Sequence, residues 1–163
     1  MLARHGLSQL PIWNTEGGWG KDAQLPDENQ QASFLVKWYL INFTNGVARA
    51  YWYQWDNPEW GTLWRESSGV TPAAKAYQQV YGWLDGVTAV GPCGSKPSST
   101  FWTCDLLKGS TRFRVAWSAS GTAPLTDNAK VVAITQVGGL APQSNDQPVI
   151  VDSRPTLFRI KEP

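Results

Sequence analysis

The sequence predicts an α/β segment followed by an all-β segment. Residues 1–88 alternate between strand-like and helix-like stretches, which is typical of parallel βα units. The composition changes in TAVGPCGSKPSS, where Gly, Pro and Ser interrupt the periodic pattern. From residue 100 onward only strand-like runs follow, separated by turn residues, and they predict a small antiparallel sheet or β-sandwich. We therefore expect a βα segment at 1–88, a linker at 89–99 and a β-domain at 100–163.

The first βα unit is predicted upstream of residue 47. The run SQLPIWNTE is rich in β-formers and predicts a strand at about 10–15. Asp27 is a suitable N-cap for the helix that follows, and Gly46 is a suitable residue just beyond its end. Between them, apolar side chains recur at helical spacing: Ala32, Leu35, Trp38, Tyr39 and Phe43.

The second βα unit is predicted to start with a strand at 47–55. Nearly every position of VARAYWYQWD is apolar, which favours a strand buried on both faces of a parallel sheet. A loop, NPEWGTLWRESSG, follows it. The next helix has Thr71 as N-cap, Pro72 at its first position and Gly86 at its end. Its predicted apolar face consists of Ala73, Ala76, Tyr77, Val80, Tyr81 and Leu84.

The strands predicted in the β-domain are five short runs. They are TFWTCDLL, RFRVAWSA, KVVAITQV, VIVDS and PTLFRI. None of them shows a helical period, and turn residues lie between them.

Composition and charge exclude several classes of protein. The chain has 163 residues, a net charge of +1 and no apolar run near the roughly 20 residues that cross a bilayer, so we expect neither membrane nor nucleic acid as a partner. His5 is the only histidine and there are two cysteines, too few for a zinc site. There is no GxGxxG motif and no P-loop, so we expect no metal and no cofactor.

Two cysteines flank a short polar loop. Cys93 and Cys104 in PCGSKPSSTFWTC are predicted to form a disulfide, the alternative being two buried free thiols. A disulfide favours an oxidising compartment, so we expect a secreted, extracellular protein. Residues 1–10, MLARHGLSQL, lack the apolar core of a signal peptide. The chain is therefore expected to be a mature piece or a fragment that begins inside a larger protein.

The candidate site lies where the two predicted parallel strands end. Glu16 lies at the carboxyl end of the first strand, and Gly17 and Gly18 let the backbone turn there. In βα architectures this end carries the chemistry, although an isolated glutamate in a turn is often only a turn residue. Indoles gather around both strand ends, and flat rings beside a carboxylate suit a sugar, the alternative being an aromatic core. The candidate substrate-binding residues are Trp13, Trp19, Trp52, Trp55, Trp60 and Trp64.

Three motifs in order resemble the last two βα units of a retaining glycoside hydrolase of the (β/α)8 clan A. They are LPIWNTEGGWG, ARAYWYQWDN and TPAAKAYQQVYGWL, and the runs FWTCDL, RFRVAWSA and PTLFRI resemble the small β-domain appended to such barrels. The resemblance implies a partial barrel at 1–88, with Glu16 as nucleophile and Trp52 or Trp55 at the sugar subsite. It also implies a carbohydrate as the substrate or ligand.

The chain departs from the clan in one catalytic residue. A complete barrel needs about 250 residues, and the acid/base glutamate of the fourth strand has no counterpart in this sequence. Internal substitutes are Glu28, Asp56 and Glu59, with Asp27 in the same loops. The acid could also come from another chain, because two uncovered βα units predict a homo-oligomer or pairing with a separate N-terminal barrel part. The alternatives are a non-catalytic carbohydrate-binding or structural remnant and a truncated gene product.

Overall fold

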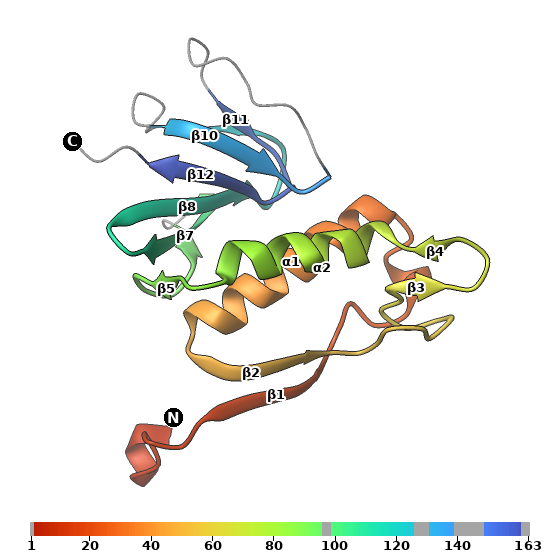
Figure 1. Cartoon of the computed structure of the whole chain (residues 1–163), viewed down its shortest axis with the longest axis horizontal. Helices are drawn as coiled ribbons and strands as arrows, with labels where there is room; N and C mark the ends of the chain where they lie inside the picture. Colours follow the sequence, from red (N-terminus) through yellow and green to blue (C-terminus); the bar gives the residue numbers. More distant parts are fainter. Residues whose placement is uncertain (1, 96–98, 126–130, 139–148, 161–163) are drawn as a thin grey trace.

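The chain folds into layers with two helices in the middle. The computed structural model describes residues 2–95, 99–125, 131–138 and 149–160. A pair of strands lies on one side of the helices and a larger sheet lies on the other (Figure 1). The described residues form no closed barrel.

The first layer consists of β1 (Ile12–Gly17) and β2 (Val47–Trp52), which pair in parallel. Their register places Ile12 opposite Val47 and Gly17 opposite Trp52. Helix α1 (Glu28–Thr44) connects them, preceded by the short 3-10 helix η2 (Asp22–Gln24); another, η1 (Leu2–His5), lies before β1. The predicted first strand and the parallel βα order are confirmed, whereas β2 ends three residues before the predicted boundary.

The helix ends follow the predicted capping residues. The Asp27 carboxylate accepts hydrogen bonds from the backbone N–H groups of Asn29 and Gln30, and Gly46 has a φ of +74° just beyond α1. Helix α2 (Pro72–Leu84) begins after Thr71, whose hydroxyl accepts from the Ala74 N–H. Both predicted helices are therefore confirmed with their caps.

The two helices bury their shared side against each other. The core between them and the neighbouring strands includes Ala32, Leu35, Val36, Leu40, Ala73, Ala76 and Val80. Tyr81 is 68% exposed, so its predicted place on the buried face of α2 is wrong.

The prediction that the second strand is buried on both faces is wrong. The Trp52 indole packs on the side of α1, against Trp38 and Tyr39. On the opposite face, Arg49 and Tyr51 are exposed, because no described residues form a layer there (Figure 1). A high density of apolar residues in a strand indicates that both of its faces can be covered. It does not indicate whether the residues that cover them belong to the same chain.

The third layer is an antiparallel sheet of six strands in the order β10-β12-β8-β7-β5, with β6 also paired to β7. The long strands are β7 (Phe101–Lys108), β8 (Thr111–Ser118), β10 (Val131–Gln136) and β12 (Thr156–Ile160), as predicted from the runs in the sequence. The strands β5 (Thr88–Ala89) and β6 (Gly94–Ser95) overlap the predicted linker and join the sheet. Short-range patterns miss such strands because their pairing partner is distant in the sequence.

Two further pairs of short strands complete the described structure. The strands β9 (Ala123–Pro124) and β11 (Ile150–Val151) pair beside β8, over a core that includes Ala116, Val151 and Phe158. The strands β3 (Trp64–Arg65) and β4 (Gly69–Val70) form a hairpin in the loop between β2 and α2. None of the described helices is long and apolar enough to cross a membrane.

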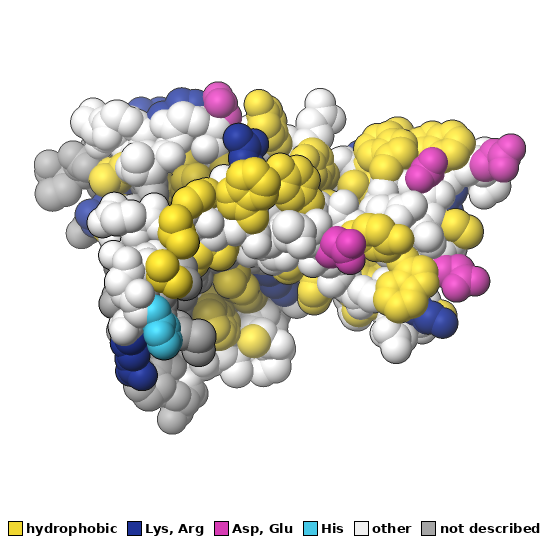
Figure 2. Space-filling view, turned by 90° about the horizontal axis from the view of Figure 1, so that it is seen from below, with side chains coloured by type: hydrophobic (Ala, Val, Ile, Leu, Met, Phe, Trp, Pro, Cys, Tyr) yellow, Lys and Arg dark blue, Asp and Glu magenta, His cyan; other side chains and the backbone are white. Residues whose placement is uncertain are grey.

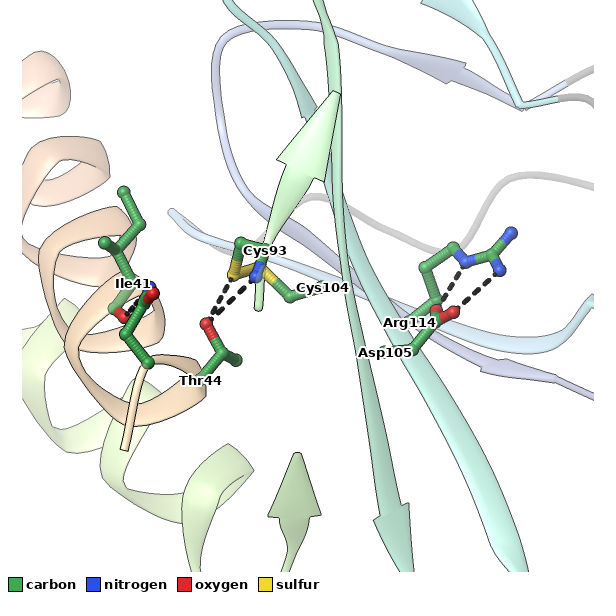
Figure 3. The surroundings of a disulfide bond; sticks show 7 residues. Ile41, Thr44, Cys93, Cys104, Asp105 and Arg114 are labelled. Carbon is green, nitrogen blue, oxygen red and sulfur yellow. Dashed lines mark hydrogen bonds and ion pairs between the residues drawn. A yellow bond between two sulfur atoms is a disulfide. The ribbon is translucent and has the colours of Figure 1, made fainter. Parts of the chain in front are cut away.

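Cys93 and Cys104 form a disulfide, as predicted. The bond joins the segment around β6 to β7, and Figure 3 shows Thr44 of α1 pointing toward it. The Thr44 oxygen accepts a hydrogen bond from the Cys93 N–H at 3.1 Å and lies 3.2 Å from its Sγ. The disulfide therefore holds the β6 segment against β7, and the Thr44 hydroxyl holds the same segment against the end of α1.

A lysine of α1 faces the larger sheet. The Lys37 ammonium lies 5.9 Å from the centre of the Trp117 ring of β8. Burial lowers the pKa of Lys37, while the Asp152 carboxylate opposes this effect. The contact between α1 and the sheet thus includes a partly desolvated cation.

Candidate functional site

Two loops meet at the carboxyl ends of β1 and β2 and are held together by backbone hydrogen bonds. The Tyr53 N–H donates to the Gly17 carbonyl at 2.7 Å, and the Gly61 N–H donates to the Gly20 carbonyl at 3.2 Å. Further along, the Asp22 N–H donates to the Glu59 carbonyl at 2.7 Å. These bonds make one continuous surface from two loops that lie about forty residues apart in the sequence.

The two glycines after Glu16 are required by close contacts. A Cβ atom on Gly18 would lie 2.7 Å from the Tyr53 carbonyl oxygen. Gly17 lies against the ring of Trp38 on the helix side of the sheet. Only residues without a side chain allow the first loop to turn here against β2 and α1.

The Glu16 carboxylate is exposed at the end of β1. The register of β1 against β2 is irregular between Asn14 and Gly17, the stretch that contains Glu16. Glu16 itself is exposed to solvent. Within the described part of the chain, its side chain has no hydrogen bond or ion pair. The carboxylate is therefore free to meet a ligand.

Two of the six candidate tryptophans are packed into the fold. Trp19, a candidate substrate-binding residue, is buried, and its Nε1 donates to the Asp22 carboxylate at 2.9 Å. Its ring lies 5.1 Å from that of Trp52, whose own Nε1 donates to the Gly61 carbonyl at 2.8 Å. The N–H groups of these two indoles donate hydrogen bonds to the loops, and their rings pack against each other below the loops. Trp38 and Trp83 are partly buried, and Trp83 packs against the core.

The other four candidate tryptophans are open to solvent. Trp13 and Trp55 are 54% and 55% exposed, and Trp60 and Trp64 are also exposed. Figure 2 shows hydrophobic side chains gathered on this face of the molecule, with acidic side chains between and beyond them. Cations of the chain itself lie over two of these rings. The Arg49 guanidinium lies 5.3 Å from the centre of the Trp13 ring, and the Lys21 ammonium lies 5.5 Å from the centre of the Trp60 ring.

A cavity of about 680 Å³ lies beside these loops. Its lining consists of Asp56, Pro58, Trp64, Arg65, Glu66 and Ser67. Sequence reasoning missed Pro58 and the last three of these residues. The last three are brought back toward Asp56 by the β3–β4 hairpin and by the Leu63 and Trp64 N–H groups, which both donate to the Trp55 carbonyl. A second cavity of about 580 Å³ lies elsewhere, between the two helices and the segment around Val137.

The three candidate substitute acids have different surroundings. Glu28, at the start of α1, forms an ion pair with Arg65. Asp56 lines the cavity together with the Trp64 indole. Glu59 is exposed, and its backbone N–H donates to the Asn57 side chain at 2.8 Å. Among the described residues no group of His, Cys, Asp and Glu is arranged to hold a metal ion.

A carboxylate and exposed indoles thus lie on the loops after two parallel strands, the end at which α/β proteins commonly carry their site. Comparison of the sequence with protein-family models and with curated proteins finds no match. The fold is similar to that of a GH30 endoxylanase from Clostridium papyrosolvens C71, with a TM-score of 0.63 and 14% identity. It is also similar to a glycoside hydrolase family 30 subfamily 8 xylanase from Clostridium acetobutylicum, with a TM-score of 0.57 and 17% identity.

The similarity covers 99% of this chain but 44% of each xylanase. The chain thus spans less than half the length of these enzymes and shares the fold of one part of them. This finding confirms, at the level of fold, the glycoside hydrolase resemblance of the sequence.

Proposed function

We propose that this chain carries part of a retaining glycoside hydrolase site, with Glu16 as the nucleophile. In this proposal residues 1–88 correspond to the last two βα units of a (β/α)8 barrel, and 100–163 correspond to a small β-sandwich appended to it. The ligand is an oligosaccharide or polysaccharide, and the disulfide suits an extracellular location. The fold shared with two xylanases supports this assignment.

The observation that carries the proposal is the state of Glu16. A nucleophilic carboxylate must be accessible, and Glu16 is exposed, lies at the carboxyl end of β1 and has no partner among the described residues. Trp55 is the better of the two subsite candidates, because Trp52 packs on the helix side.

The proposed site also needs an acid/base group. Retaining hydrolysis needs a second carboxyl group about 5 Å from the nucleophile to protonate the departing oxygen. Among the candidate substitutes, Asp56 lines the cavity, whereas Glu28 is engaged by Arg65. We propose that another polypeptide, either a second copy or a separate barrel part, supplies the acid when Asp56 does not.

The test uses a substrate whose leaving group needs no acid. With a 2,4-dinitrophenyl 2-deoxy-2-fluoro-β-glycoside, a Glu16 oxygen attacks the anomeric carbon and the bond to the phenolic oxygen breaks. Dinitrophenolate then leaves with the electron pair, and the fluorine slows hydrolysis of the glycosyl-enzyme. Mass spectrometry of the labelled protein is expected to locate one sugar on the peptide that contains Glu16.

Two variants control this experiment. Glu16→Gln is expected to abolish labelling, whereas Asp85→Asn, at the end of α2, is expected to label like the unmodified chain. A chain that remains unlabelled with gluco- and xylo-configured reagents would overturn the nucleophile assignment.

A second candidate function is carbohydrate binding without turnover. The exposure of four indoles on one group of loops favours it, because ring stacking on a sugar needs no catalytic acid. Here Trp55→Ala and Trp64→Ala are each expected to weaken oligosaccharide binding by about tenfold. The two functions differ in the labelling experiment, since binding alone leaves no sugar on Glu16.

A further inference from the structure

We propose that the carbohydrate site selects sugars by charge, favouring amino sugars over neutral sugars and rejecting uronic acids. The proposal rests on the function proposed above and assigns a substrate class to the part of that surface that the cavity beside Asp56 and Trp64 forms. It follows from two observations. Carboxylates line the cavity beside the strand ends, and the cations nearby already contact acids or indoles of the chain itself.

The lining of the cavity is acidic. Asp56 and Glu66 both line it and are both exposed, and the Trp64 indole lies in the same lining. A pyranose ring resting on this indole would bring its substituents near two carboxylates. An ammonium group on such a ring gains from both charges, and a carboxylate group is repelled by both.

The guanidinium in the lining does not cancel these charges. Arg65 forms an ion pair with Glu28, and its second terminal nitrogen lies 3.4 Å from the Asp22 carboxylate. Two carboxylates therefore line the cavity, and the one guanidinium in the lining is paired with two acids that lie outside it. Because Arg65 is already paired with two acids, its positive charge is offset and attracts a uronate less than an unpaired guanidinium would.

The other cations near the site are engaged with indoles. Lys21 lies over Trp60 and Arg49 lies over Trp13. Neither residue lines the cavity. These contacts also show that exposed indoles on this surface attract positive charge, which favours an ammonium-bearing sugar on Trp64 as well.

The test compares three trisaccharides with the same β-1,4 linkage. They are trimers of glucose, glucosamine and glucuronic acid, which differ only at C2 or C6 of each ring. Binding is measured by calorimetry at about pH 6, where the amines are protonated. The glucosamine trimer is expected to bind at least about tenfold more tightly than the glucuronic acid trimer, with the glucose trimer between them.

Variants and salt separate charge selection from general affinity. The double variant Asp56→Asn and Glu66→Gln is expected to bring the three affinities within about threefold of one another, and Asp85→Asn is expected to leave the order unchanged. In the unmodified chain, raising the salt concentration is expected to weaken binding of the glucosamine trimer and not that of the glucose trimer.

The outcomes distinguish the two proposals. Equal or tighter binding of the glucuronic acid trimer would overturn charge selection while leaving carbohydrate binding intact. Failure of all three trimers to bind, by a chain whose circular dichroism shows it to be folded, would overturn both proposals.

Discussion

A Cβ atom on Gly17 would lie 2.0 Å from the indole of Trp38. The end of β1 therefore packs directly on α1. The indole is rigid, so it has no flexible end that could move away from an added methyl group. We predict that Gly17→Ala destabilises the fold by about 1–3 kcal/mol, because the indole or the strand must shift. Urea unfolding followed by tryptophan fluorescence measures the difference.

A glycine in α2 offers the matched control. A Cβ on Gly82 meets nothing within 4 Å, so Gly82→Ala is expected to stabilise the helix by about 0.5–1 kcal/mol. Equal unfolding midpoints for the two alanine variants would contradict the assigned packing of β1 on α1.

The second prediction concerns the disulfide between Cys93 and Cys104. Replacing both residues by serine is expected to cost about 2–3 kcal/mol of stability, since the loop that the bond closes spans 11 positions. The measurement is thermal unfolding with and without reductant. Reductant should lower the midpoint of the unmodified chain only, and a shift of equal size in the serine variant would contradict a role for this bond.

The third prediction concerns acid stability. Burial raises the pKa of Asp152, but its hydrogen bonds with Arg154 outweigh this effect and the pKa is lowered overall. A folded-state pKa below the unfolded one contributes stability at neutral pH, and this contribution is lost as the pH falls below about 4. Asp152→Asn is therefore expected to be less stable than the parent chain at pH 7, with a difference that shrinks below pH 4. A constant difference in urea midpoint between about pH 7 and pH 2 would contradict this assignment.

The fourth prediction concerns the open face of β1 and β2. Ile12, Trp13 and Tyr51 are exposed there, and exposed apolar area favours association at roughly 25 cal/mol per Å². We predict a light-scattering mass above the 18.0 kDa of one chain at micromolar concentration. Ile12→Lys with Tyr51→Lys should reduce it, whereas Tyr81→Lys on α2 should not. A mass near one chain before any substitution would rule the prediction out.

Local signals in the sequence predicted the helices and the long strands. Asp27, Thr71 and Pro72 mark helix starts through contacts with residues two or three positions away, so one sequence contains the necessary information. The short strands β5 and β6 have no such local signal, because they exist only through pairing with β7. The wrong burial prediction for β2 has the same origin, since the covering layer depends on distant residues.

The position of the candidate site could be predicted from the sequence, but only some of its residues could. Glu16 and the indole-rich loops follow from where the predicted strands end. The burial of Trp19 depends on its bond to Asp22, and the place of Arg65 and Glu66 in the cavity depends on the β3–β4 hairpin. Neither arrangement follows from residue types or spacing alone.

The packed indoles beneath the loops also have an optical consequence. Trp52 lies 5.1 Å from Trp19 and 5.5 Å from Trp38, with the ring planes tilted by 54° and 83°. Excited states of rings this close couple, and coupled tilted rings give paired circular dichroism bands of opposite sign. The contribution of Trp52 to such bands would be lost as soon as the loops lose their register, even while both helices and the Trp102–Trp117 pair of the larger sheet stay in place. The chain thus contains its own spectroscopic reporter for the integrity of the strand ends.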